Sequence, residues 1–300
     1  MGVTKEGSMR IVILGAGVMG TRLARHFARA GYSVAVIDPS APSRAKSEEA
    51  LVQVTGPGPQ LFFAGAVSDL PEGWQACDLV IEAVPEVLEI KQAALAALEA
   101  WLPTTTLIAS NTSGLTTSSL CEKIRHPERL AIAHFFNPAD VIPVVELVAS
   151  PTMAAPRLQE LADLLAASGK IPAILHREVP GFVANRIQHA MMREAFHLVE
   201  EGVADPETID QIVRWTIGVR LAFFGPFEQR DLNGLDTHLS IASYLYPFLS
   251  AATEPFQQLR DKVAAGACGR KSGEGFYRWD EDRLARQARS EEALTRLIEE

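Results

Sequence analysis

Two polar side chains at the ends of apolar stretches have the chemistry to remove a proton from an alcohol. His134 closes the apolar stretch Leu130–His134, and Glu146 lies inside the next one, Val144–Val148. A carboxylate in such a stretch is costly to bury without a partner, so a partner is expected for Glu146. A histidine held by a carboxylate is a general base for a hydroxyl proton.

Two further polar residues stand where a hydrogen bond to a reacting oxygen atom is feasible. Ser110 ends the stretch Thr106–Ser110, and Asn185 lies in Pro180–Arg186, at the start of a helical region. Donors at such places stabilise negative charge that develops on oxygen. Ser and Asn also cap turns and helices, so both functions stay open for these two residues.

A glycine-rich turn near the start of the chain predicts a dinucleotide site. The apolar stretch Arg10–Leu14 runs into Gly15-Ala16-Gly17-Val18-Met19-Gly20, which has the pattern G-x-G-x-x-G at the mouth of a helix. The first glycine allows a tight turn, the second lets the backbone approach a pyrophosphate, and the third lets helix and strand pack closely. The helix N-terminus then presents N–H groups to the phosphates.

Asp38 strengthens this prediction and indicates which dinucleotide is bound. It ends the stretch Ser33–Asp38, at roughly the 20-residue spacing expected for a carboxylate that binds the ribose hydroxyls. A carboxylate there repels a 2′-phosphate, and Pro39 and Ser40 follow it instead of an arginine, so NAD is favoured over NADP. Arg44 is close enough in sequence to reach back toward the same place.

The first half of the chain has the pattern of a parallel sheet, with short β-branched stretches alternating with amphipathic helices. We expect helices over Val18–Ala30 and Glu86–Trp101, and a third that carries Leu158, Leu161, Leu164 and Leu165. The expected strands are Arg10–Leu14, Ser33–Asp38, Leu61–Ala64, Asp78–Val84, Thr106–Ser110, Leu130–His134, Val144–Val148 and Ile171–Leu175. This pattern predicts a Rossmann-type α/β fold, with a mainly parallel sheet and helices on both faces.

The second half predicts a separate, all-helical domain. We place the boundary near residue 177, which gives an NAD-binding domain over 1–176 and a helical substrate and dimerisation domain over 177–300. Asp205-Pro206 has the form of an N-cap followed by proline at the first helical position. The helix that it opens is expected to bury a stripe of apolar residues, namely Ile209, Ile212, Val213, Thr216 and Ile217. The cluster Gly56–Pro59 is expected to be a loop.

Composition narrows the class of protein. A formal net charge of −9 without a basic stripe argues against nucleic acid as a partner. The three cysteines, Cys77, Cys121 and Cys268, share no ligand spacing with histidines, so we expect free thiols and no metal site. Because no apolar stretch approaches 20 residues and no cleavage signal is seen, we expect a cytoplasmic protein without a membrane partner.

Taken together, these motifs resemble the 3-hydroxyacyl-CoA dehydrogenase family, including its branch of gulonate and carnitine dehydrogenases and lambda-crystallins. The resemblance covers nearly the whole chain. It is carried by Gly15–Gly20, Ile81–Glu86, Ser110–Ser113, His134–Pro138, Pro143–Val148, Pro180–Arg186, Gly225-Pro226 and Arg270–Tyr277. It implies an NAD-dependent dehydrogenase that oxidises the 3-hydroxyl group of a 3-hydroxyacyl thioester to the 3-oxo product, with reversible hydride transfer.

The resemblance also implies residue roles. His134 is the base, Glu146 its orienting partner, and Ser110 and Asn185 are donors that bind and polarise the reacting oxygen. The cofactor contacts that it implies are Gly15, Gly17, Val18, Met19, Gly20, Asp38, Glu86, Lys91, Asn137 and Lys271. The alternatives are a solvated surface charge for Lys91 and a loop charge for Lys271.

One departure from the family leaves the substrate open. Acyl-CoA members carry a long helical arm with basic residues after the second strand, whereas here the segment from Pro39 to Ala76 is short and holds only Arg44 and Lys46 as basic residues. A free small hydroxy acid, or an acyl group on an acyl carrier protein, is therefore an alternative to CoA. Arg220 is a candidate to bind a substrate carboxylate, with a surface charge at a helix end as the other interpretation.

Two expectations concern other classes of function. A non-catalytic, crystallin-like NAD-binding protein is the alternative from another class, although both His134 and Glu146 are present. The resemblance further implies a homodimer formed through the helical domain. Three aromatic side chains are candidates for that contact, namely Phe223, Phe224 and Phe227.

Overall fold

The computed structural model describes residues 9–52 and 60–299. Its contacts divide the chain into two units: the described part of Met1–Val183 with the end of the chain from Leu297, and Ala184–Arg296. The expected loop Gly56–Pro59 lies outside the described residues. The assignment of 1–176 as NAD-binding domain and 177–300 as substrate and dimerisation domain stays a prediction.

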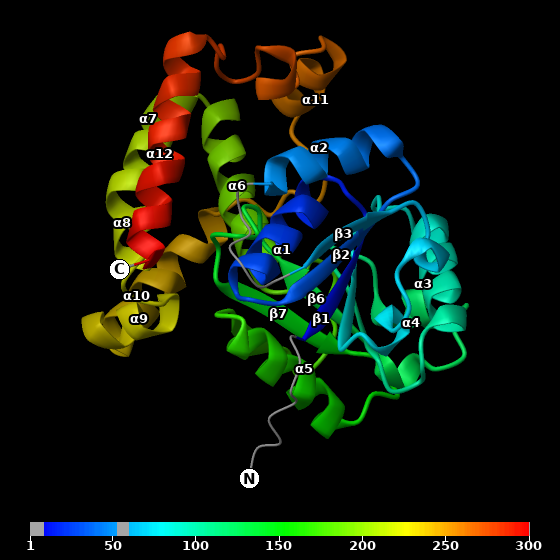
Figure 1. Ribbon diagram of the computed structural model, residues 1–300. Helices are drawn as coiled ribbons and strands as arrows, with labels where there is room; N and C mark the ends of the chain where they lie inside the picture. The colour runs from blue at the N-terminus through cyan, green and yellow to red at the C-terminus, as the bar shows by residue number, and fades with distance from the viewer. Residues whose placement is uncertain (1–8, 53–59, 300) are drawn as a thin grey trace. The chain divides into compact units, whose positions relative to one another are not determined.

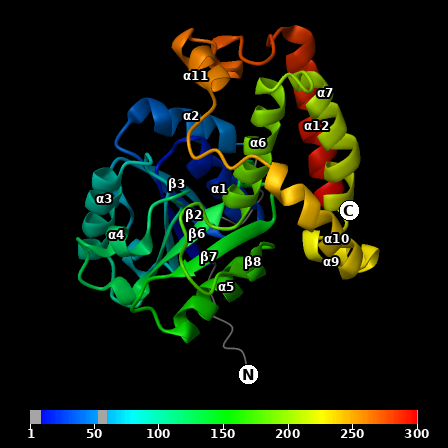
Figure 2. The same cartoon turned by 180° about the vertical axis from the view of Figure 1, so that it is seen from behind.

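Among the described residues of the first unit, eight strands form one sheet in the order β3-β2-β1-β4-β5-β6-β7-β8. All neighbouring pairs are parallel except β6 and β7. Figure 2 shows β8 beside β7 at one edge. The strands are β1 Arg10–Leu14, β2 Ser33–Ile37, β3 Leu61–Ala64, β4 Leu79–Glu82, β5 Leu107–Ser110, β6 Leu130–Phe135, β7 Val144–Ala149 and β8 Ile171–Ile174.

Helices cover both faces of this sheet (Figure 1). They are α1 Val18–Arg29, α2 Ala41–Leu51, α3 Leu88–Trp101, α4 Thr117–Cys121 and α5 Ala155–Ala167. One apolar cluster joins α1 and α5 to Ile11, Ile13 and Ile81 of the sheet. A second joins α3 and α4 to Val80 and Ile108 on the opposite face. Strands buried on both faces read as continuous apolar stretches, which is why the sequence identified them. The predicted Rossmann-type fold is confirmed.

Helix α2 is an element that the sequence analysis did not predict. It begins after Ser40, whose hydroxyl oxygen accepts a hydrogen bond from the Ser43 amide at 3.4 Å. Pro42 stands in its first turn. A serine cap of this kind contributes about 1 kcal/mol to helix stability. Ser40 and Pro42 are residue types that favour the start of a helix. However, α2 buries few apolar residues, so the spacing of apolar residues in the sequence did not indicate a helix.

The second unit is helical, as predicted. Its helices are α6 Ala184–Glu200, α7 Pro206–Ile212, a π-helical turn Val213–Gly218, α8 Val219–Leu221, α9 Pro226–Asn233, α10 Leu235–Leu245, α11 Gln257–Ala264 and α12 Glu281–Glu299. The part of α12 from Leu297 on is grouped with the first unit. Asp205 caps α7 as expected, since its Oδ1 accepts from the Thr208 amide at 2.7 Å. No helix in the described part of the chain is both long and apolar enough to span a membrane.

The prediction that α7 and the turn after it bury a stripe of apolar residues is wrong for the single chain. Ile209 is 8% exposed, but Ile212 is 54% and Ile217 39% exposed. Periodicity correctly indicated an apolar helix face, because the residues recur at helical spacing. It cannot indicate whether another part of the same chain covers that face.

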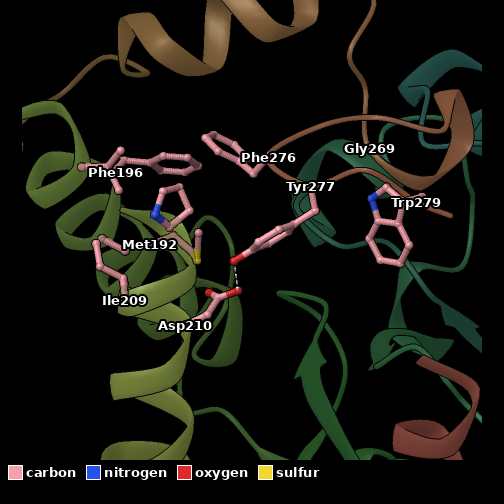
Figure 3. A pocket seen from close by; sticks show the side chains of 11 residues that line it. Met192, Phe196, Ile209, Asp210, Gly269, Phe276, Tyr277 and Trp279 are labelled. Atoms are coloured by element: carbon pink, nitrogen blue, oxygen red, sulfur yellow. Dashed lines mark hydrogen bonds between the residues drawn. The ribbon is translucent and has the colours of Figure 1, made fainter. Parts of the chain in front are cut away.

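Within the second unit, α6, α7 and the turn near Tyr277 line an open apolar pocket of about 290 Å³ (Figure 3). The rings of Phe196 and Phe276 lie 5.6 Å apart, and the Tyr277 hydroxyl donates to Asp210 Oδ2 at 2.7 Å. Burial and the Asp210 carboxylate raise the pKa of Tyr277 to about 12. This hydrogen bond ties the turn to α7.

Candidate active site

Polar residues form a row on one face of the sheet, at the carboxyl ends of three neighbouring strands. Glu82, Ser110 and His134 each follow by two positions an apolar residue of the cluster that packs on α3 and α4. Because alternate residues of a strand point to the same face, these three side chains lie on that face too. Ligands of open α/β sheets bind outside the carboxyl ends of the strands, so the row marks the candidate site.

The histidine and the carboxylate predicted to pair do meet. His134 and Glu146 stand directly opposite each other in the antiparallel ladder of β6 and β7, and His134 Nδ1 lies 2.8 Å from Glu146 Oε2. The two residues are 5% and 3% exposed. The other carboxylate oxygen, Oε1, accepts from the Val183 amide at 2.9 Å. Since the carboxylate only accepts, the network assigns the ring hydrogen to Nδ1 and a lone pair to Nε2.

Aromatic rings surround this imidazole. The ring centroid of His134 lies 4.5 Å from that of Phe136 and 5.3 Å from that of Phe182. Phe182 is 1% exposed and has a φ of 50°, a left-handed conformation that costs about 1–2 kcal/mol for a residue with a side chain. This turn places the Phe182 ring on the histidine and the Val183 amide on Glu146. The pair therefore sits in an apolar, oriented environment.

The glycine-rich turn fits a dinucleotide. Gly15 has a φ of 109°, and a Cβ atom there would lie 2.6 Å from the Ala83 carbonyl oxygen. A Cβ atom on Gly20 would lie 1.8 Å from the Gly15 oxygen, so both positions exclude a side chain. Gly17 caps α1 without a side-chain hydrogen bond, which leaves the first-turn N–H groups to a ligand.

Asp38 lies directly after β2, beside this turn. Its Oδ2 accepts from the Ala16 amide at 2.8 Å, and its Oδ1 accepts from the Ser40 amide at 2.8 Å. Arg44 does reach back, but its guanidinium donates to the main-chain oxygen of Asp38. The carboxylate is thus held next to the phosphate cradle, where a ribose would follow.

Lys91 is not a surface charge. It is 1% exposed, and its Nζ lies 2.8 Å from Glu82 Oε1 and 3.2 Å from Glu86 Oε2. It also donates to the Val84 carbonyl oxygen at 3.2 Å. Glu82, which is fully buried, was missed as a site residue. The signal that found Glu146, a carboxylate within an apolar stretch, was present at Glu82 as well.

Glu86 is tied to the loop that follows β5. Thr112 Oγ1 donates to Glu86 Oε1 at 2.5 Å, and the Ser113 amide donates to the same oxygen at 2.9 Å. Burial is the largest single influence on this carboxyl group and raises its pKa. The hydrogen bonds and the charge of Lys91 outweigh burial, so the pKa of Glu86 lies below its usual value. The group is therefore anionic at neutral pH.

Ser110 joins the same network. It is fully buried, and its hydroxyl group donates to Glu82 Oε2 at 2.5 Å. A chain of hydrogen bonds thus runs from Ser110 through Glu82 and Lys91 to Glu86. The structure brings Ser110, His134 and Glu146 to one face and one edge of the sheet.

The other predicted site residues are placed as follows. Val18 and Met19 form the first turn of α1, and Asn137 is exposed in the loop after β6. Three belong to the second unit, and their roles stay predictions: Asn185 is half-buried in α6, Lys271 is exposed, and Arg220 is exposed with its Nε donating to the Thr216 carbonyl oxygen. Within the described ranges, no group of three His, Cys, Asp or Glu residues could hold a metal ion.

A dinucleotide cradle and a paired histidine at the carboxyl ends of strands of one sheet are the arrangement of an NAD-dependent dehydrogenase that acts on hydroxyl groups, and comparison with known proteins agrees. The NAD binding domain model of 3-hydroxyacyl-CoA dehydrogenase matches residues 10–58 and 59–179, and the C-terminal domain model matches 181–279. The chain belongs to the 3-hydroxyacyl-CoA dehydrogenase family, and its cofactor is NAD.

Relatives of known name differ in their substrates. A 5-formyl-3-hydroxy-2-methylpyridine 4-carboxylate 5-dehydrogenase of Mesorhizobium japonicum is 35% identical and aligns over 96% of this chain and 98% of its own length. An L-carnitine dehydrogenase of Nocardiopsis dassonvillei is 34% identical, over 98% and 94%. The family therefore includes full-length relatives that are named for small acids.

Solved structures of enzymes that are named for different substrates also resemble this chain. A crystal structure of a 5-formyl-3-hydroxy-2-methylpyridine 4-carboxylic acid 5-dehydrogenase, described as an NAD+ dependent dismutase, matches with a TM-score of 0.88 and 32% identity over 97% of each chain. An (S)-3-hydroxybutyryl-CoA dehydrogenase of Ralstonia eutropha matches with a TM-score of 0.70 and 29% identity, over 92% of this chain and 100% of the other.

Proposed function

We propose that this chain oxidises the hydroxyl group of a small hydroxy acid to a carbonyl group, with NAD as the oxidant and His134 as the base. The observation that carries the proposal is the buried hydrogen bond of 2.8 Å between His134 Nδ1 and Glu146 Oε2. It leaves the Nε2 lone pair available to accept the hydroxyl proton. The negative charge of Glu146 then stabilises the imidazolium ion that forms.

The surrounding residues have supporting roles in this mechanism. The Phe136 and Phe182 rings limit the access of water to the imidazole, which strengthens its interaction with Glu146. The first turn of α1 and Asp38 would hold NAD, which supplies a hydride acceptor when bound. Asn185 is proposed as a donor to the reacting oxygen, and Arg220 as a partner for the substrate carboxylate.

A free acid is favoured over a CoA thioester by the segment after β2. The described part of that segment holds one helix, α2, with Arg44 and Lys46 as its basic residues. Arg44 already donates to the Asp38 main chain, which leaves little positive charge for a CoA nucleotide. The higher TM-score with the pyridine carboxylate enzyme than with the hydroxybutyryl-CoA enzyme supports the same choice.

A 3-hydroxyacyl thioester is the second candidate substrate, and the family to which both halves of the chain belong favours it. Reduction of NAD at alkaline pH separates the candidates. The panel contains 3-hydroxybutyryl-CoA, its pantetheine thioester as a mimic of a carrier-bound group, free 3-hydroxybutyrate, gulonate, carnitine, and a hydroxymethylpyridine carboxylate. We expect the highest kcat/KM with a free acid, and a preference for the CoA thioester would overturn that choice.

The same assay tests the base. His134→Gln should lower kcat by orders of magnitude while NAD affinity is kept, because the imidazole is the proton acceptor. His126→Gln is the matched control, since the His126 side chain is 41% exposed and pairs with Glu128 at the surface. Turnover of His134→Gln near that of the control would eliminate the proposed base.

We propose that the active form is a homodimer, with a second copy covering the apolar faces of the second unit. Phe223, Phe227 and Phe248 are 70%, 87% and 78% exposed in the single chain. Exposed apolar surface of this kind marks a contact site. Sedimentation at micromolar concentration should give twice the chain mass, and Phe227→Asp should lower it. A monomeric wild-type protein would refute the proposal.

A further inference from the structure

Residues 179–182 form a tight turn that carries the Phe182 ring. The Phe182 amide donates to the Val179 carbonyl oxygen at 3.0 Å, and Pro180 and Gly181 stand between the two residues. Proline followed by glycine, here with a φ of 76°, is typical of a type II turn. Phe182 continues in the left-handed region with its φ of 50°. A left-handed residue with a side chain persists only where surrounding contacts hold it.

Glu178 stands directly before this turn and binds it to α4. Its Oε1 and Oε2 each accept from the Thr117 amide at 3.1 Å, and its Oε2 also accepts from Thr117 Oγ1 at 2.6 Å. Thr117 is the first residue of α4 and is 1% exposed. Because a carboxylate makes hydrogen bonds roughly twice as strong as those of a neutral acceptor, this contact fixes the residue at which the turn begins.

The other end of the turn contacts the His134–Glu146 pair. The Val183 amide donates to Glu146 Oε1 at 2.9 Å, and the centroid of the buried Phe182 ring lies 5.3 Å from that of His134. Residues 179–182 alone separate Glu178 from Val183. Since so short a turn transmits a shift of its first residue to its last, both contacts depend on where the turn begins.

We propose that Glu178 is a positioning residue for the proton acceptor. By holding the start of the turn on Thr117, it keeps the Phe182 ring on His134 and the Val183 amide on Glu146. Without Glu178, Phe182 can leave its left-handed conformation, and the imidazole is then held less firmly toward the hydroxyl proton. The effect on catalysis rests on the proposed function, whereas the placement of the turn does not.

Kinetics measure the effect on the base. Glu178→Ala should lower kcat about 10-fold, the effect of losing one hydrogen bond to a charged group, while the Kd of NAD is kept. Glu178→Gln retains an acceptor for the Thr117 amide and should recover most of this loss. A kcat of Glu178→Ala equal to that of wild type would overturn the proposal.

A double-mutant cycle tests whether Glu178 acts through Thr117. Thr117→Val removes only the hydroxyl donor, so it is the milder variant and should lower kcat less than Glu178→Ala does. In the Glu178→Ala background, Thr117→Val should cause no further loss, because the contact is already absent. Losses that add in full would show that the two residues act separately, and that result would overturn the proposal.

Proton NMR of the free protein tests the placement of the turn without a substrate. The Nδ1 hydrogen of His134 is buried and hydrogen-bonded to Glu146, so it should give a downfield resonance that is absent from His134→Gln. Glu178→Ala should speed the exchange of this hydrogen with water about 10-fold, because the turn opens more often. Unchanged exchange would overturn the proposal.

Glu99→Ala is the matched control for both measurements. The Glu99 carboxylate likewise accepts from two main-chain amides, those of Arg125 at 2.7 Å and His126 at 2.6 Å. Its loss should lower stability but keep kcat and the exchange rate, and equal changes in Glu99→Ala and Glu178→Ala would refute a specific role of Glu178. A wild-type chain inert toward every alcohol would overturn the proposed function, and the exchange measurement would still decide the placement of the turn.

Discussion

Replacing Glu146 by glutamine tests the tautomer of His134. In the wild-type chain one carboxylate oxygen accepts from His134 Nδ1–H and the other accepts from the Val183 amide. The amide group introduced by Glu146→Gln has a single oxygen atom. If that oxygen faces Val183, the NH2 group faces His134 Nδ1, and the ring hydrogen must move to Nε2. The imidazole then has no lone pair toward the substrate.

The expected loss of kcat in Glu146→Gln follows from these contacts. The opposite amide orientation would set an NH2 group against the Val183 N–H group, where the carboxylate oxygen now accepts at 2.9 Å. An unsatisfied buried donor costs about 1–3 kcal/mol, and because this contact is only partly buried the lower end applies, so the base-competent tautomer becomes the minor form by roughly 5-fold. Loss of the charge that stabilises the imidazolium adds a further factor. The total should approach the loss of about 10⁴ in kcat seen when the triad carboxylate of a serine protease becomes an amide.

The assay is NADH formation under saturating NAD, with the substrate that the panel identifies. Glu146→Gln should keep NAD affinity and a similar melting temperature, because its hydrogen bonds with His134 and with the Val183 amide are retained. Glu146→Asp, which keeps the charge but is shorter, should retain more turnover than Glu146→Gln. A kcat of Glu146→Gln within tenfold of wild type would refute the assigned tautomer and with it the role of Glu146.

Three further predictions concern the first unit. Gly15→Ala should weaken NAD binding, measured by calorimetry, and lower the melting temperature, because the added Cβ atom would overlap the backbone; unchanged values would contradict the close approach. Lys91→Met should lower the free energy of unfolding in urea by about 3–5 kcal/mol, since it leaves the buried Glu82 charge unpaired; exposed Lys123→Met is its control, and equal losses would argue against the buried pair. Burial lowers the pKa of His26 from 6.5 to about 3, so folding stability from its neutral ring is full above pH 6.5 and is lost as the pH falls toward 3; His26→Gln should flatten this decline, and an unchanged slope would contradict it.

Much of the site was readable from the sequence because its signals are local. The glycine pattern, the spacing to Asp38, and a carboxylate within the apolar stretch of β7 each depend on a few neighbouring residues. The strands were found within a residue or two for the same reason, since strands buried on both faces are continuously apolar. For Glu146 the sequence itself predicted only that a buried carboxylate needs a partner, and the resemblance to the family implied that the partner is His134.

The parts of the site that the sequence did not predict depend on where side chains point and on the local backbone conformation, which residue types alone do not determine. The sequence shows that Ser110 has a hydroxyl group, but only the position of Glu82 fixes where its hydrogen points. Lys91 could have faced solvent or the sheet, and its burial depends on the turn that starts α3. The left-handed conformation of Phe182 is likewise invisible in a residue type that rarely adopts it.

The placement of the His134–Glu146 pair has a consequence for how specificity can change. Both residues, the Phe182 ring and the Val183 amide belong to the first unit, so the antiparallel pair β6–β7 and the turn that follows β8 carry the proton chemistry. The contacts of the imidazole with the carboxylate, and of the carboxylate with the Val183 amide, thereby lie within the first unit. Chimeras that join residues 1–183 of this chain to the helical half of a relative should exchange substrate preference while keeping the same base.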